Sequence, residues 1–319
     1  MSQPPPTYAE SLACLASRVQ RPVVTIGNFD GLHLGHQAIF ADVRRAARAA
    51  DTQGVAISFQ PHPVVFFGKQ PEPTFLINTP EQKLALSRAA GIDHPVLLPF
   101  GRDLASLSPE AFVHEVLHEA LDARSVWVGY DFNFGKGRAG TTEDLRRHAQ
   151  ARGMEVHVHE AVRFDGDVVS STRVRKALAA GDFALCRHLL GRDHTLRGVV
   201  VRGEQRGREL GFPTANVFPR AGMMIPHGIY VSTLWDDATA WPAVTSVGVR
   251  PTIGDDLAPN VETYVLDRTD LQLYGHEVDV TLHKWLRPEL KFDSLDELVA
   301  AIEVDCDLAR AWHTEGPRH

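Results

Sequence analysis

The fold of the first half of the chain is decided by the stretch Val23-Val24-Thr25-Ile26-Gly27-Asn28-Phe29-Asp30-Gly31-Leu32-His33-Leu34-Gly35-His36. Residues 23–26 form an apolar, β-branched run, which is typical of a strand buried in a parallel sheet. From His36 onward, apolar residues recur at helical spacing as far as Ala50. A strand, a glycine-rich turn and an amphipathic helix in this order predict the first unit of an alternating α/β fold.

The alternation of strand and helix signals continues beyond this stretch. Three further apolar runs predict strands at residues 55–59, 96–98 and 126–128. Helices are predicted to begin at Pro80 and at Pro109. The pattern predicts a doubly wound, Rossmann-like parallel sheet, in which ligands bind at the carboxyl ends of the strands.

The second half of the chain, after Asp193, has a different pattern. Runs rich in Val, Thr, Tyr and Trp are separated by turn residues, and they occupy residues 195–202, 228–235, 241–247, 261–266 and 276–285. This spacing predicts an antiparallel barrel or sandwich. We place the domain boundary near Gly191, which gives domains at residues 1–190 and 191–319.

One helix is predicted to close the chain. Ser294 and Glu297 have the spacing of a capping box at its start. Its core-facing stripe is predicted to consist of Leu298, Ile302, Leu308 and Trp312.

The composition of the 319 residues is that of a folded protein, with 44% hydrophobic and 23% charged residues. A net charge of −7 argues against a protein that coats nucleic acid, which needs excess Lys and Arg. No apolar run approaches the roughly 18 residues of a membrane helix, and the N-terminus lacks a signal-peptide pattern. Cys14, Cys186 and Cys306 are a poor disulfide framework. We therefore predict a cytoplasmic protein with no membrane or nucleic-acid partner and leave its oligomeric state open.

His33 and His36 flank a glycine where the first helix is predicted to begin. Imidazole donors and the free N–H groups of a helix N-terminus suit a phosphate group. Such a site can stabilise charge while an α-phosphate is attacked and pyrophosphate leaves. The alternatives are a turn with surface histidines and a zinc site, which is disfavoured because no third His or Cys ligand is nearby. The predicted nucleotide-binding residues of this segment are Gly27, Phe29, Asp30, His33, Gly35 and His36.

A second candidate phosphate site is the segment Ser170-Ser171-Thr172-Arg173-Val174-Arg175. A Ser or Thr is predicted to cap a helix that runs to Ala179. The hydroxyls of Ser171 and Thr172, the free N–H groups and Arg175 would form an anion cradle. Alone, the segment is more simply a capped surface helix, but together with the histidine segment it predicts a two-ended triphosphate clamp.

Aromatic residues follow the second predicted strand. The turn Phe59-Gln60-Pro61-His62-Pro63 precedes Phe66 and Phe67, and Phe134 lies later in the domain. A flat aromatic ligand could stack on these rings, although each phenylalanine taken singly is equally well explained as core. Residues 135–140 match GxGxxG, but they come too late for a Rossmann fingerprint and predict a mobile basic loop.

The barrel half has neither a P-loop nor a protein-kinase signature, but it contains a stretch rich in glycine and arginine that ends in GFPTAN. Gly203 and Arg208 could hold phosphates there. The hydroxyl of Thr214 and the carbonyl of Asn216 are hard oxygen ligands of the kind that Mg²⁺ accepts. Glu262 could take a proton from an attacking hydroxyl, or it could be an ordinary solvated glutamate.

Taken together, these motifs resemble a known family. GNFDGLHLGH, FQPHP, GYDFNFG and SSTRVR are similar to the adenylyltransferase half of the bacterial bifunctional riboflavin kinase/FMN adenylyltransferases, or prokaryotic FAD synthetases. GRELGFPTAN, SVGVRPT, VETYVLD, LYGHEV and LRPELKF resemble their riboflavin kinase half. Both sets follow the order and spacing of the family.

The resemblance implies two reactions that use ATP with Mg²⁺. The C-terminal barrel would phosphorylate riboflavin, giving FMN and ADP, and the N-terminal domain would join FMN to the AMP part of ATP, giving FAD and pyrophosphate. In similar enzymes, the glutamate that matches Glu262 is the catalytic base. The residues that match Thr214 and Asn216 hold the metal and the nucleotide phosphates.

The resemblance also assigns roles around the flavin and the phosphates. His33 and His36 would stabilise the adenylyl transition state, and the leaving phosphates would be held by Ser171, Thr172 and Arg175. The flavin of the transferase would be lined by Pro63, Phe67, Asp131 and Phe134. Arg287 falls in the segment that approaches the flavin of the kinase.

Two positions depart from the family pattern. Tyr264 stands where His is expected after Glu-Thr, and Ser58 stands where Thr is commoner. Neither touches a proposed catalytic atom, so both activities are expected. The alternatives are a single-activity paralogue and a flavin-binding regulator that binds flavin without consuming ATP.

Overall fold

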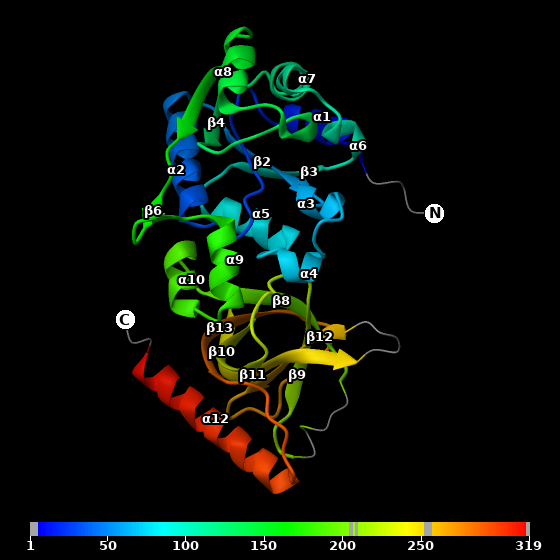
Figure 1. Cartoon of the computed structure of the whole chain (residues 1–319), viewed down its shortest axis with the longest axis vertical. Coiled ribbons are helices and arrows are strands. Elements are labelled where there is room, and N and C mark those ends of the chain that lie inside the picture. Colours follow the sequence, from blue (N-terminus) through cyan, green and yellow to red (C-terminus); the bar gives the residue numbers. More distant parts are fainter. Residues whose placement is uncertain (1–5, 204–206, 208–209, 252–256, 317–319) are drawn as a thin grey trace. The chain divides into compact units, whose positions relative to one another are not determined.

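The computed structural model describes residues 6–203, 207, 210–251 and 257–316 (Figure 1). The chain divides into two compact units, one made of Met1–Pro71 with Pro80–Ser170 and the other of Glu72–Thr79 with Ser171–His319. In the described part of the chain, no helix has both the length and the apolar character needed to cross a membrane.

The first unit contains a five-stranded parallel sheet with the order β3-β2-β1-β4-β5. Its strands are β1 (Val23–Ile26), β2 (Gly54–Gln60), β3 (His94–Pro99), β4 (Ser125–Gly129) and β5 (Glu155–His159), with a hairpin of β6 (Arg163–Phe164) and β7 (Asp167–Val168). Its helices are α1 (Tyr8–Ala16), α2 (Leu34–Ala49), α3 (Pro63–Phe66), α5 (Pro80–Ala89), α6 (Arg102–Ala105), α7 (Pro109–Ala111), the π-helix η1 (Phe112–Glu119), the 3₁₀ turn η2 (Lys136–Arg138) and α8 (Thr142–Gln150). The predicted alternating α/β fold is confirmed, although the helix that begins at Pro109 continues mostly as a π-helix.

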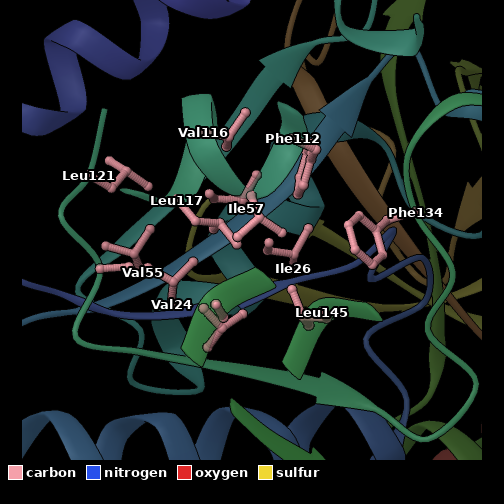
Figure 2. Close-up of a cluster of buried hydrophobic side chains, with 14 of the residues drawn as sticks. Val24, Ile26, Val55, Ile57, Phe112, Val116, Leu117, Leu121, Phe134 and Leu145 are labelled. Atoms are coloured by element: carbon pink, nitrogen blue, oxygen red, sulfur yellow. The ribbon is translucent and has the colours of Figure 1, made fainter. Parts of the chain in front are cut away.

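Strand β1 is buried on both faces, which explains its uninterrupted apolar run. Val24 and Ile26 point into one cluster with side chains of β2, η1 and α8, as Figure 2 shows. Val23 belongs to a second cluster on the opposite face, which includes Phe40 and Val43 of α2. Because side chains alternate along a strand, helices must cover both faces of the sheet.

The second unit is a closed, antiparallel six-stranded barrel with the order β10-β11-β12-β9-β8-β13. Its strands are β8 (His194–Val201), β9 (Thr214–Pro219), β10 (Gly228–Asp236), β11 (Thr239–Pro251), β12 (Leu257–Val265) and β13 (Glu277–Arg287). Its helices are α4 (Glu72–Phe75), α9 (Ser171–Ala179), α10 (Phe183–Leu190) and α12 (Leu295–Glu315). The barrel alternative is confirmed, and β9 is a strand that the sequence pattern had not indicated.

The closing helix α12 lies against β10 and β11 (Figure 1). Its predicted start is confirmed, since the Oγ of Ser294 accepts from the backbone N–H of Glu297 at 3.2 Å. The predicted capping box is only half correct, because the Glu297 carboxylate accepts from the N–H of Asp293 at 3.1 Å, one residue earlier than expected. The predicted stripe is wrong at Leu308, which is 50% exposed, whereas Asp305 is buried at 3%.

A buried ion pair explains why a carboxylate faces the barrel. The guanidinium of Arg287, at the end of β13, donates to Asp305 through Nε at 3.0 and 3.1 Å and through Nη2 at 2.6 Å. The pair fastens α12 to the strand, and bidentate geometry of this kind is the strong form of an Arg–carboxylate contact.

We expect Asp305→Asn to lower the free energy of unfolding by about 2–4 kcal/mol, because removing one partner of a buried pair leaves the other charge uncompensated. Urea unfolding of the full chain measures the change. Glu303→Gln, an exposed position on the same helix, is the matched control and should leave the midpoint unchanged. An Asp305→Asn variant as stable as the wild type would show that the ion pair does not stabilise the packing of α12 on the barrel.

Candidate active sites

The paired histidines lie where β1 ends and α2 begins. His33 is the N-cap of α2 and is buried at 6%, and His36 lies in the first turn. The two imidazole rings stack with centroids 3.6 Å apart and an interplanar angle of 22°. A Cβ at Gly35 would come within 3.1 Å of the His33 ring, so glycine is needed for this stack. The arrangement combines imidazoles with the N-terminus of a 16-residue helix, which favours an anion.

The protonation state of His36 is controlled by its surroundings. Its Nδ1 is buried, with no hydrogen-bond partner in the described part of the chain. Burial, followed by the proximity of His33 and of Lys83, lowers the pKa of His36 well below its ordinary value of 6.5. His36 is therefore neutral at pH 7 in the free protein.

Two other predicted residues of this loop, Phe29 and Asp30, have buried side chains. Phe29 has a φ of +45° and its ring is 3% exposed, packing edge-on against His36 and Phe40. A Cβ at Gly27 would lie 2.9 Å from that ring. Asp30 is 1% exposed. The side chains of Phe29 and Asp30 are thus interior, and a nucleotide would meet this part of the loop through its backbone.

The carboxyl ends of β2, β1 and β4 lie next to one another in the sheet, so the segments that follow them meet at one edge. Pro63 begins α3 after β2, and Phe67 is 58% exposed beside the rings of Phe66 and Phe100. Asp131 follows β4 and is exposed. These positions offer an aromatic surface and a carboxylate at the expected edge.

Phe134 differs from the other predicted flavin-binding residues. It is 6% exposed and packs against Phe112 and Phe132 in the hydrophobic cluster shown in Figure 2. For this residue the structure supports the core alternative. Residues 135–140 form a tight loop, which Phe134 and Gly140 close with two backbone hydrogen bonds of 3.1 and 2.9 Å.

The predicted anion cradle begins helix α9, which runs from Ser171 to Ala179 as expected. Arg175 donates from Nε to the carbonyl oxygen of Phe75 at 2.8 Å, and its guanidinium lies 4.0 Å from the centre of the Phe75 ring. Ser171, Thr172 and Arg175 belong to the second compact unit and the paired histidines to the first. The two-ended clamp therefore stays a prediction.

The barrel brings three predicted residues together. Glu262 on β12 lies directly opposite Asn216 on β9, and Tyr264 lies opposite Thr214 in the same register. Because directly opposed residues share a face of the sheet and alternate residues return to it, Thr214, Asn216 and Glu262 point to the same side. Glu262 is half-buried, so it is not the fully solvated glutamate of the alternative interpretation.

The loop before β9 approaches this face closely. A Cβ at Gly203 would lie 2.4 Å from the amide group of Asn216, so only glycine allows the observed contact. The amide itself is 8% exposed and is held in one place by this packing. Arg208, which was also predicted to bind phosphate, lies outside the described residues.

The structure adds residues that the sequence pattern did not single out. Asn260 donates from Nδ2 to the Oε1 of Glu262 at 3.0 Å, which orients the carboxylate. A pocket at Thr214 and Asn216 is also lined by the chain after β12, including Arg268 and Tyr274. Tyr274, the aromatic residue in LYGHEV, is the feature of the sequence that could have indicated this pocket.

Comparison with known proteins identifies both halves of the chain. The family model described as FAD synthetase matches residues 16–173, and the one described as riboflavin kinase matches residues 190–313. A bifunctional riboflavin kinase/FMN adenylyltransferase from Pseudomonas fluorescens is 39% identical over 295 residues, which cover 91% of this chain and 92% of the relative. The chain belongs to the bifunctional riboflavin kinase/FMN adenylyltransferases.

Further comparisons agree with the assignment. The bifunctional riboflavin kinase/FMN adenylyltransferase of Escherichia coli K12 is 35% identical and covers 89% of this chain and 90% of its own length. A crystal structure from Streptococcus pneumoniae, titled as a macrolide-efflux protein, is 30% identical with a TM-score of 0.80, covering 93% of this chain and 97% of that one. This likeness in structure extends over both units.

The barrel has a donor set that fits Mg²⁺ bound together with ATP. The described residues contain no cluster of three or more His, Cys, Asp or Glu side chains that would form a metal cage of their own. Thr214 and Asn216 instead offer two neutral oxygens at the pocket. Mg²⁺ is commonly held by a few protein oxygens together with substrate phosphates and water.

Proposed function

We propose that this chain makes FAD from riboflavin in two ATP-dependent steps, one in each half. The observation that carries the kinase half is the cross-strand pair of Glu262 and Asn216, with Thr214 on the same face. The transferase half is supported by the stacked histidines at the N-terminus of α2. Phosphoryl and nucleotidyl transfer depend mainly on positioning and charge neutralisation, which both sites provide.

In the first step, the 5′-hydroxyl oxygen of riboflavin bonds to the γ-phosphorus of ATP and the bond from that phosphorus to ADP breaks. Glu262 takes the hydroxyl proton, and Asn260 holds its carboxylate in place. Thr214 and Asn216 would hold Mg²⁺ together with the phosphates, and the metal would supply charge neutralisation there. Gly203 and Arg208 contribute to phosphate binding. Arg287 contributes to the flavin site and, through its contact with Asp305, also holds α12 against the end of β13.

In the second step, a phosphate oxygen of FMN bonds to the α-phosphorus of ATP, and the bond to the pyrophosphate oxygen breaks. His33 and His36 stabilise the charge that develops at the phosphates, together with the N-terminus of α2. Ser171, Thr172 and Arg175 hold the leaving pyrophosphate. Pro63, Phe67 and Asp131 line the flavin site of the transferase. Both reactions take place in the cytoplasm and need no nucleic-acid partner.

The test is a time course of the purified protein with riboflavin, ATP and Mg²⁺, with the flavins separated by chromatography. FMN should appear first and FAD second, and chelation of Mg²⁺ should stop both. FMN without FAD, even when FMN is supplied, would make the chain a single-activity kinase. If neither flavin were converted, the result would support the alternative interpretation, a flavin-binding regulator without enzymatic activity.

We expect Asn260→Ala to lower the kcat of riboflavin phosphorylation about tenfold with little change in KM, because Glu262 loses the hydrogen bond that orients it. Asn260→Asp should also lower the kcat of the kinase, because it replaces the donor amide with a second carboxylate that repels Glu262. FMN adenylylation by the same variants is the internal control. Wild-type kcat values in both variants would exclude the orienting role.

A further inference from the structure

Tyr264, which stands where the family pattern has His, packs against the segment that leads into Thr214. Its ring meets the ring of Phe212 edge-on, with centroids 5.3 Å apart and an interplanar angle of 78°. Tyr264 on β12 also lies directly opposite Thr214 on β9, and it is on the same face of its strand as Glu262. Tyr264 therefore lies beside both ends of the short segment from Phe212 to Thr214.

The two rings rest on a common support. Both are partly buried and pack against one hydrophobic cluster of the second unit, which consists of Val231, Val244, Leu266, Cys306 and Ala309. Because Cys306 and Ala309 belong to α12, the closing helix contributes to this support. Edge-to-face aromatic pairs are stabilising beyond the area that they bury, so the contact favours one position of the Phe212 ring.

The segment between Phe212 and Thr214 is short and stiff. Pro213 has a fixed φ, and it also restricts the backbone of the residue before it. On the other side, the N–H of Phe212 donates to the carbonyl oxygen of Gly207 at 2.7 Å, and a Cβ at Gly207 would come within 2.4 Å of the Phe212 carbonyl oxygen. A displacement of the Phe212 ring would thus be passed on to Thr214, which follows the proline.

Thr214 lines the pocket to which we assign ATP and Mg²⁺, whereas the described residues that line this pocket do not include Tyr264 or Phe212. The coordination geometry of Mg²⁺ is strict, so an oxygen ligand has to be held in its productive position. The aromatic pair can therefore act on the site only from outside, through the position of Thr214.

We propose that Tyr264 is a positioning residue of the kinase site: its ring holds Phe212 and thereby places the hydroxyl of Thr214 for Mg²⁺ and the phosphates of ATP. This inference rests on the proposed riboflavin phosphorylation. It gives a role to one of the two departures from the family pattern, because Tyr264 reaches the site through Phe212 without touching a reacting group.

The first experiment is Tyr264→Leu, which keeps an apolar side chain and removes the aromatic contact. With saturating riboflavin and excess Mg²⁺, the KM for ATP in FMN formation should rise about fivefold, because Thr214 loses its fixed position and an aromatic pair contributes roughly this factor. The KM for riboflavin should change little. Tyr264→Phe keeps the ring and should restore the KM for ATP. Phe218→Leu removes an exposed ring from β9 and is the matched control, which should leave the KM for ATP unchanged.

The second experiment observes Thr214 directly, by NMR of the full chain labelled with ¹³C at its threonine methyl groups. Comparison with Thr214→Ser assigns the resonance. Titration with ADP and Mg²⁺, which involves no turnover, should shift this resonance, and Tyr264→Leu should raise the ADP concentration at half-saturation by the same factor as the KM for ATP. Phe212→Leu removes the same contact from its other side and should have the same effect.

A double-mutant cycle decides whether Tyr264 acts through Thr214. In a Thr214→Ala background, Tyr264→Leu should raise the KM for ATP no further, because the group that it positions is gone. Additive effects of the two substitutions would overturn the proposal, and so would a wild-type ADP titration in Tyr264→Leu. If Tyr264→Leu did not fold, Phe212→Leu would replace it in the cycle and in the titration, with the same criteria.

The outcomes also separate this inference from the proposed function. Absence of FMN formation by the wild type would contradict riboflavin phosphorylation itself. Normal FMN formation by the wild type, together with an unchanged Thr214 resonance and an unchanged KM for ATP in Tyr264→Leu, would contradict only the positioning role of Tyr264.

Discussion

Glu262→Gln should abolish FMN formation from riboflavin while leaving FAD formation from supplied FMN intact. The amide cannot take the proton from the attacking hydroxyl, and a positioned general base contributes about 10²–10⁴-fold to such a rate. The substitution keeps an oxygen where Asn260 donates, at 3.0 Å in the wild type, so the strand pairing and the side-chain position should survive. The two rates are measured separately, with riboflavin or with FMN as the starting flavin.

The matched control is Glu277→Gln, a strand carboxylate on the same barrel that pairs with Arg220 at the surface. An exposed pair of this kind contributes little to stability, so this variant should keep both activities. If Glu262→Gln phosphorylated riboflavin at the wild-type rate, Glu262 would be a structural strand residue and the base would have to be sought elsewhere. Loss of both activities in Glu262→Gln would contradict two independent sites.

The fold was predictable where local pattern and tertiary environment agree. The apolar run of β1 indicates burial on both faces, and clusters on both faces of the sheet bury it. Strand β9 was missed because Thr214-Ala215-Asn216 has no apolar alternation of its own. It becomes a strand by pairing with β12 and β8, which is a long-range effect that local propensity does not report.

The candidate sites were predictable at the level of motifs and less so at the level of side-chain environment. Phe67 and Phe134 are the same residue type in neighbouring motifs, yet one is 58% and the other 6% exposed. Periodicity placed Leu308 on the core face of α12, but Leu308 is exposed, whereas Asp305 is buried and pairs with Arg287. A lysine in an amphipathic helix normally faces water, so nothing in the sequence pattern indicated that Lys83 is buried.

His36→Ala should have the opposite effect to Glu262→Gln: FAD formation from FMN should fall about 10²–10³-fold while riboflavin phosphorylation continues. The expected size is that of removing one preorganised group that stabilises developing charge at the reacting centre. The ring of His36 stacks on His33 and is packed by Phe29, so its removal also takes away the stacking contact of the second histidine. The loss should therefore appear mainly in kcat, with FMN supplied at saturating concentration.

A histidine on the outer strand of the same sheet provides the control for this variant. His157 on β5 has a side chain that is 41% exposed, and His157→Ala should leave both activities unchanged. Comparable urea midpoints for the two variants would show that a loss in His36→Ala is chemical. A folded His36→Ala enzyme with wild-type FAD formation would mean that His36 has no catalytic role in adenylyl transfer, and that His33 and the N-terminus of α2 suffice for it.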